Sequence, residues 1–259
     1  MTTDHPTKRT LGVDLASQPA KTGICVVEWG DGRATVKHLA SAASDEAILD
    51  LHHSCDITGI DMPFGWPEPF VDFLLGNPSA DPEEWSDAWK KKLRFRRTDF
   101  AVHKITGRWP LSVSSDRIAI PAMRCRGLLT EMGVTDLSGD GRVFEVYPAA
   151  ALWRWGLPHQ KYKRKKGRAI LMGLVRDLLN RCPWLEVDSA TRKILTESDD
   201  AFDALVCALV ARAAALGLTV PPESEDLESA RREGWIHLPV EGALGRLVGA
   251  EITGSVSKE

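Results

Sequence analysis

The sequence lacks long apolar runs, paired cysteines and a strong net charge. No window approaches the roughly 20 apolar residues that cross a bilayer, and the polar residues 1–10 lack the apolar core of a signal peptide. The five cysteines are scattered without C-x-x-C spacing, which argues against a zinc site or a disulfide framework. The net charge of -3 gives no overall attraction to nucleic acid. We therefore expect a cytoplasmic protein with no membrane partner, whose affinity for nucleic acid would require a local basic patch.

The N-terminal quarter of the chain predicts the start of a mixed sheet. Three apolar runs separated by turns are typical of an antiparallel meander, and a fourth run follows a segment with helical spacing that Ser44 can cap. A helix between two strands favours a crossover to a parallel strand. The expected strands are residues 11–16, 23–27, 34–39 and 55–61, and the expected helix is 45–53.

The rest of the chain divides into an insertion and a continuation of the core. Prolines punctuate residues 63–141, in which only short helices are expected, at 83–92 and 123–132. Core elements resume with a fifth strand at 142–147, a helix from about 168, a helix from Ser198 to about Leu216, and an edge strand at 234–239. We predict one domain over residues 1–250, with its core at 10–62 and 142–240, its insertion at 63–141, and a disordered tail at 251–259.

Acidic residues occur where a core element would normally be apolar. Asp14 lies inside the first strand, Asp61 ends the fourth, and Glu145 lies inside the fifth, while Asp200 and Asp203 lie three apart on the last long helix. Parallel neighbouring strands would bring Asp14 beside Asp61, and a helix packed on the sheet can add Asp203. Such an oxygen-rich cluster suits Mg²⁺ or Mn²⁺, and two ions about 3.5–4 Å apart can hydrolyse a phosphodiester.

Each of these acids also has a structural interpretation. The helix dipole alone favours Asp200 near a helix N-terminus, and Asp61 before Met62 and Pro63 can begin a turn. Glu145 alternates with apolar neighbours, so it can point to solvent. A solvent-facing role is least expected for Asp14, because a charge inside a buried strand is costly without a compensating partner.

Two basic segments are candidate substrate contacts. Arg96, Arg97 and Thr98 follow three lysines, and guanidinium groups bind phosphate in a bidentate manner. Lys163 belongs to the second segment, residues 161–168, which can hold a phosphate backbone or simply be solvated. Four tryptophans of the insertion region can stack on bases or fill a small core: Trp66, Trp85, Trp89 and Trp109.

Several of these stretches together resemble the uncharacterised family of predicted ribonuclease H-like nucleases. The matching stretches are residues 12–16, 59–67, 95–99, 110–112, 144–148, 162–163, 199–205 and 234–239. The resemblance implies an α/β fold with a mixed five-stranded sheet flanked by helices, and a partly helical insertion after the fourth strand. It also implies that Asp14 and Asp61 are metal ligands, and that Asp200 and Asp203 correspond to the paired aspartates of Holliday-junction resolvases.

Three functions are compatible with the sequence. The first is a nuclease in which Asp14, Asp61, Asp200 and Asp203 bind Mg²⁺ or Mn²⁺ and Glu145 is a further ligand or base. The second is a non-catalytic nucleic-acid-binding or scaffold protein whose acids are structural. The third, suggested by the Gly-x-Asp opening, is an ATP-dependent phosphotransferase of the actin or sugar-kinase type, but no later glycine-rich phosphate loop supports it.

Overall fold

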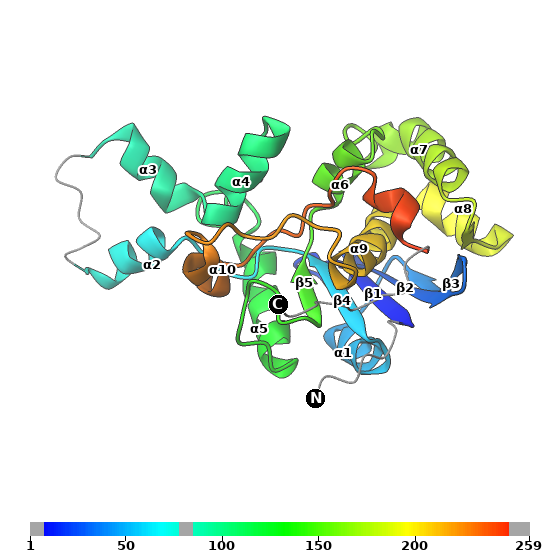
Figure 1. Cartoon of the computed structure of the whole chain (residues 1–259), viewed down its shortest axis with the longest axis horizontal. Coiled ribbons are helices and arrows are strands. Elements are labelled where there is room, and N and C mark those ends of the chain that lie inside the picture. Colours follow the sequence, from blue (N-terminus) through cyan, green and yellow to red (C-terminus); the bar gives the residue numbers. More distant parts are fainter. Residues whose placement is uncertain (1–7, 78–84, 249–259) are drawn as a thin grey trace, which may run out of the picture.

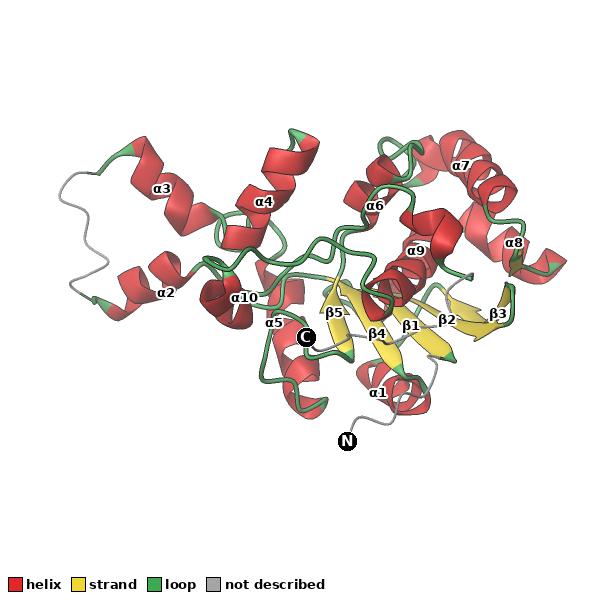
Figure 2. Ribbon diagram, in the orientation of Figure 1, coloured by secondary structure: helices red, strands yellow, loops and turns green. Residues whose placement is uncertain are grey.

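A mixed β-sheet with helices on both faces forms the body of the protein in the computed structural model, which describes residues 8–77 and 85–248 (Figures 1 and 2). The first three strands form the expected antiparallel meander, and the others join in parallel pairs. The spatial order is β5-β4-β1-β2-β3-β6. The strands are β1 (Arg9–Asp14), β2 (Gly23–Gly30), β3 (Arg33–Ala40), β4 (Ile57–Asp61), β5 (Val143–Glu145) and β6 (Leu185–Glu186).

The mixed sheet and its antiparallel start confirm the predicted α/β class, but the described chain has six strands where five were expected. The additional strand, β6, is only two residues long and pairs with β3. Two residues are too few to show a period, so no sequence pattern indicates this strand. The expected edge strand at 234–239 is reduced to isolated bridges from Ile236 to Glu145 and from Pro239 to Thr219.

Two groups of helices cover the two faces of the sheet (Figure 2). On one face lie α6 (Pro148–Arg154), α7 (Arg168–Arg181), α8 (Ser189–Glu197) and α9 (Asp199–Ala215). On the other face lie α1 (Asp45–Ser54) and α5 (Ala119–Glu131). Local signals set the ends of two of these helices, because Ser44 and Ser198 accept hydrogen bonds from the backbone N–H groups of Ala47 and Ala201.

Residues between β4 and β5 extend the molecule sideways from the sheet. They contribute α2 (Glu68–Leu75), α3 (Asp87–Arg94), α4 (Arg97–Thr106) and α5, and α10 (Leu227–Glu233) packs beside them. Figure 1 shows α2 and α3 at the far left, away from the strands. Residues 83 and 84 of the expected helix at 83–92, the tail at 251–259 and most of the N-terminal segment lie outside the described residues.

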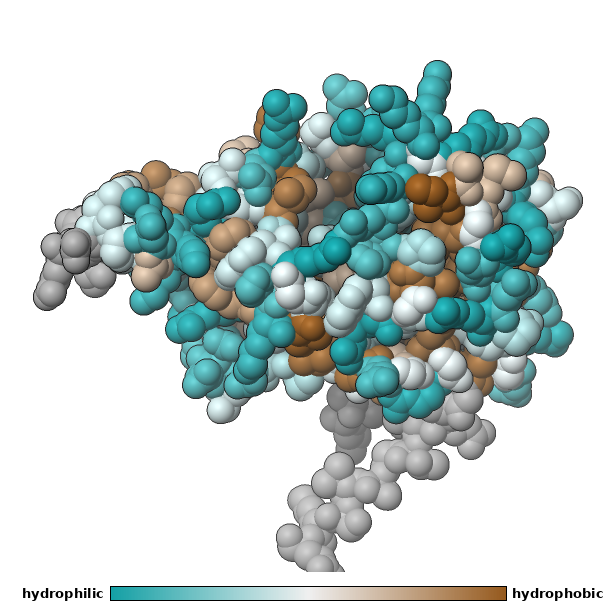
Figure 3. Space-filling view, turned by 90° about the horizontal axis from the view of Figure 1, so that it is seen from above, coloured by the Kyte–Doolittle hydropathy of each residue, from teal (hydrophilic) through white to brown (hydrophobic). Residues whose placement is uncertain are grey.

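The arm formed by α2 and α3 is held together by aromatic rings but leaves apolar side chains exposed. Phe73 contacts Trp85 and Trp89 at ring-centre distances of 5.9 and 5.6 Å. Leu74 and Leu75 are exposed on α2. In the space-filling view of Figure 3, apolar residues lie scattered among hydrophilic ones over the visible face. A search of the described helices for a membrane-crossing segment finds none of sufficient length and apolarity.

Candidate functional site

Alternation along the strands directs Asp14 and Asp61 to the face covered by α9. Gly12 and Gly59 lie two residues before these acids, and a Cβ atom added to either glycine would meet the backbone of α9. Side chains two residues apart share one face of a strand, so Asp14 and Asp61 face the helix as well. Asp14 and Asp61 are also register partners on the adjacent parallel strands β1 and β4.

The absence of side chains at Gly12 and Gly23 lets α9 lie directly on the sheet. A Cβ atom at Gly12 would lie 2.0 Å from the carbonyl oxygen of Ala204, and one at Gly23 would lie 2.1 Å from that of Asp200. This close approach brings the first turns of α9 over the C-terminal ends of β1 and β4. Asp203, which is completely buried, therefore joins Asp14 and Asp61, and we call these three residues the carboxylate cluster.

The loop before α7 supplies two partners for the carboxylate cluster. The Tyr162 hydroxyl donates to Asp203 Oδ1 at 2.8 Å, and Lys163 Nζ lies 2.6 Å from Asp203 Oδ2 as an ion pair. Asp203 Oδ2 therefore has the Lys163 ammonium group as its partner. A completely buried carboxylate oxygen that already contacts one cation can accept another cation only in its place.

Burial and the charges of neighbouring acids raise the pKa values of all three carboxyl groups. Burial is the main cause for each, and the charge of Asp203 raises the pKa of Asp14 further. Burial raises the pKa of Asp61 to about 7, although the charge of Lys163 opposes this shift. Burial alone would lower the pKa of Lys163, but the surrounding charges, chiefly those of Asp203 and Asp14, raise it. Lys163 is therefore charged at neutral pH and faces several acids.

Comparison with known families identifies the chain. The family model described as "Protein of unknown function (DUF429)" matches residues 12–226. The chain belongs to this family. The match includes the whole carboxylate cluster together with Tyr162 and Lys163, and it ends before α10. A search of curated proteins finds no significant match.

Asp200 and Glu145 lie differently from the three clustered acids in this DUF429 chain. Asp200 is only partly buried at the start of α9, and burial and the neighbouring Asp199 raise its pKa. It is close enough to add to the electrostatic cost of ionising Asp14. Glu145 lies two residues after Val143 in β5, and Val143 packs in the layer of α1 and α5. Its side chain therefore projects to the sheet face opposite Asp14 and Asp61.

A buried ion-pair network includes Glu145 and Arg96, and Thr98, another of the predicted phosphate-binding residues, lies buried beside it. Arg96 is 1% exposed and donates to both Glu145 oxygens, from Nη1 at 2.8 Å and from Nη2 at 2.7 Å. Asp99 binds the same guanidinium group, and Thr98 is fully buried and accepts from the Ile236 N–H at 2.7 Å. Direct substrate contact by Arg96 and Thr98 is inconsistent with this burial, and we assign them to holding α4 against β5.

The other predicted substrate contacts are accessible. Arg97 is 61% exposed and lies 3.7 Å from Asp226 in a loose ion pair. Lys163 is 51% exposed along its side chain although its ammonium group reaches the cluster. Exposed basic residues surround Lys163 in the sequence: Lys161, Arg164, Lys165, Lys166 and Arg168. The second basic segment thus adjoins the carboxylate cluster, whereas the first is divided between the arm and the buried network.

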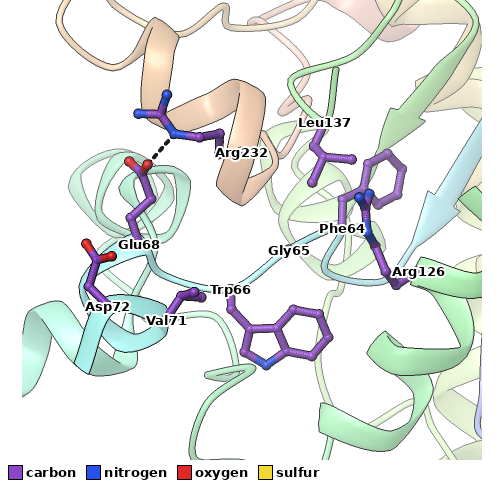
Figure 4. Close-up of a pocket in the computed structure, with 9 residues that line it drawn as sticks. All are labelled: Phe64, Gly65, Trp66, Glu68, Val71, Asp72, Arg126, Leu137 and Arg232. Atoms are coloured by element: carbon purple, nitrogen blue, oxygen red, sulfur yellow. Dashed lines mark hydrogen bonds and ion pairs between the residues drawn. The ribbon is translucent and has the colours of Figure 1, made fainter. Parts of the chain in front are cut away.

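The tryptophans expected to stack on bases are mostly engaged within the protein. Trp89 packs in the arm, and Trp109 stacks on Phe95 and His103 at ring-centre distances of 4.1 and 4.0 Å. Trp66 lines a cavity of about 430 Å³ between α2, α5 and α10, whose wall includes the ion pair of Glu68 with Arg232 (Figure 4). No residue of the carboxylate cluster lines this cavity.

Two polar residues of this region were not predicted as site residues. Tyr162 contacts Asp203 as described, and Tyr147 follows β5 with a pKa raised by burial and by the charge of Asp61. The signals in the sequence are that these are the two tyrosines of the chain and that both lie in stretches carrying the family resemblance, residues 144–148 and 162–163. A buried tyrosine usually needs a partner for its hydroxyl group. That rule flags both residues but does not name the partner.

Proposed function

We propose that this DUF429 protein is a metal-dependent phosphodiesterase acting on nucleic acid. The single observation that supports this most is the convergence of three carboxylates from separate elements, β1, β4 and α9, at one end of the sheet. Burial raises their pKa values. Perturbed carboxyl groups gathered at one place are typical of active sites.

The donor set of the cluster fits a hard divalent cation. Asp14, Asp61 and Asp203 offer only carboxylate oxygens, which Mg²⁺ and Mn²⁺ prefer, and Asp203 Oδ2 already contacts a cation, the Lys163 ammonium group. These three residues would hold the metal, with Asp200 next to them at the start of α9. Within residues 8–77 and 85–248, no three Asp, Glu, His or Cys residues are already arranged around a common metal position. The ligands therefore fit in chemistry but must adjust in position.

A bound divalent ion would supply an activated water and neutralise charge on a phosphate. The chain's own residues orient and confine the reacting groups. Tyr162 fixes the Asp203 carboxyl group through its hydroxyl hydrogen bond. The exposed basic residues of the segment 161–168 favour the approach of a polyanion, so that binding should weaken as salt rises. The buried Arg96 network connects α4 to β5 and keeps the insertion in place beside the core.

The direct test is cleavage of labelled DNA, RNA, RNA–DNA hybrid and four-way junction substrates with Mg²⁺ or Mn²⁺. Asp14→Asn keeps the shape of the side chain and removes its charge. We expect it to reduce the cleavage rate by about 100-fold or more, at least the effect of losing an outer-shell metal partner. Asp50→Asn, an exposed change on α1, serves as the matched control and should cleave like the wild type.

Two results would exclude this function. One is cleavage by Asp14→Asn at the wild-type rate with circular dichroism unchanged. The other is a wild-type protein that cleaves none of these substrates, whether or not it binds Mn²⁺. Salt-dependent nucleic-acid binding without either property would instead support the non-catalytic alternative.

A further inference from the structure

The segment that presents Tyr162 and Lys163 to the carboxylate cluster has an unusual backbone. Lys161 and Arg164, on either side of this pair, have φ angles of 61° and 66°. Left-handed conformations cost a non-glycine residue about 1 kcal/mol or more. Such residues persist only where their surroundings hold them, and they gather at functional sites.

Contacts with Gly167 and with the start of α9 fix this backbone conformation. Gly167 lies against the same segment, so that an added Cβ atom would be 2.4 Å from the Lys161 carbonyl oxygen and 2.3 Å from the Tyr162 carbonyl carbon. The Arg164 N–H also donates to Asp199 at 3.2 Å, at the beginning of α9. The fold therefore maintains a strained turn that directs Lys163 toward Asp203.

The Lys163 ammonium group has the position of a bound cation. It lies 2.6 Å from the completely buried Asp203 Oδ2, and the charges of Asp14 and Asp61 act on it as well. Among the described residues, the charge of Lys163 acts on all three acids of the cluster. The side chain as a whole is 51% exposed, so its aliphatic stem reaches the surface while its ammonium group lies against the buried Asp203.

We infer that Lys163 is the resident counter-ion of the carboxylate cluster, and that its ammonium group and a divalent cation exclude each other from it. This inference rests on the proposed function in taking a divalent metal as the second occupant. The physical reason is that both cations require the same Asp203 oxygen. Two positive charges within a few ångströms of each other repel strongly where water is largely excluded.

This arrangement explains why the three acids do not yet surround a common metal position. In the described chain Asp203 contacts the Lys163 ammonium group, and the charges of Asp14 and Asp61 act on that group as well; the ammonium is one charge on a flexible stem. A divalent ion, with twice the charge, would compensate the cluster more fully. The Lys163 side chain thus raises the metal concentration needed to fill the site, because the metal must displace a cation tethered to the chain.

The test is Mn²⁺ binding measured by electron paramagnetic resonance in oxygen-free buffer. Lys163→Met keeps an unbranched side chain and removes the charge, and Lys165→Met removes an exposed charge in the following turn, η3 (Lys165–Gly167). Binding is measured at about pH 8.5, so that protons compete little with metal for the carboxylates. We expect Lys163→Met to bind Mn²⁺ about tenfold or more tightly than the wild type, and Lys165→Met to bind like the wild type.

A second measurement uses only the wild-type protein, in case Lys163→Met does not fold. Acetylation of individual lysines is followed by mass spectrometry with and without saturating Mn²⁺. We expect Mn²⁺ to increase the rate at Lys163, whose ammonium group is released from Asp203, and to leave Lys165 unchanged. An unchanged or lower rate at Lys163 in the metal-bound protein would overturn the inference.

The two proposals fail in different ways. Equal Mn²⁺ affinities of the wild type and Lys163→Met would refute the counter-ion role and leave a metal-dependent nuclease intact. Tighter binding by Lys163→Met, without cleavage of any substrate by the wild type, would support the counter-ion role and refute the nuclease. Absence of Mn²⁺ binding by both proteins would refute both proposals.

Discussion

Replacing Arg96 by methionine should lower the free energy of unfolding far more than a substitution of a neighbouring surface residue. Methionine has a similar length but no charge, so Arg96→Met leaves the carboxylates of Asp99 and Glu145 buried without their cation. Both are almost inaccessible, at 0% and 2% exposure. The guanidinium group also donates to the Glu233 carbonyl oxygen at 3.1 Å, which ties α10 to the same network.

The magnitude follows from the loss of one partner of a buried ion pair. Such changes cost about 3–5 kcal/mol, because the remaining charge has no compensation. For a chain of this size, each kcal/mol lowers Tm by about 2–4 °C, so we expect a decrease of about 6–20 °C. The assay is urea denaturation and calorimetry of the variant beside Arg97→Met. Arg97 is the adjacent residue, 61% exposed, and its loss should cost less than about 1 kcal/mol.

A further variant separates lost charge compensation from lost packing. Adding Glu145→Gln to Arg96→Met removes one of the two uncompensated charges and should recover part of the free energy of unfolding. The reasoning is refuted if Arg96→Met and Arg97→Met lose equal stability. It is also refuted if Glu145→Gln destabilises the Arg96→Met protein further, since the buried charge would then not be the cause.

Two other predictions concern packing and pH. Gly12→Ala should lower the free energy of unfolding by about 3 kcal/mol or more, because the added Cβ would overlap the backbone of α9. Gly173→Ala has open space around its Cβ and should raise Tm slightly. Equal Tm values for the two variants would contradict the close approach of α9 to the sheet. Burial lowers the pKa of His237 from 6.5 to about 4, so between these pH values the unfolded chain binds a proton that the folded chain does not. The free energy of unfolding should therefore rise with pH over this window, by up to about 3 kcal/mol, and part of this rise should be absent in His237→Leu but present in the exposed control His53→Leu.

Much of the core could be predicted from the sequence because local rules fix it. Period-two apolar runs predicted the meander and the parallel fourth strand. Serine caps indicated the starts of α1 and α9, and the i, i+3, i+4 spacing indicated the apolar positions of α9. The meeting of Asp14 with Asp61 also followed from the sequence, since strand order and parallel direction bring the ends of β1 and β4 together.

What the sequence left open depended on contacts between distant segments. The residues next to Glu145 in the sequence are the same whether its side chain faces solvent or a buried arginine, so they do not distinguish the two cases. Only the packing of α4 against β5 placed Arg96 beside it. The basic segment 161–168 looked uniform, but its strained turn directs the single ammonium group of Lys163 to Asp203. Local sequence patterns indicated on which strand or helix each acidic residue lies. Tertiary packing alone decided which cation Glu145 and Asp203 meet, because each pairs with a side chain that lies tens of residues away in the sequence.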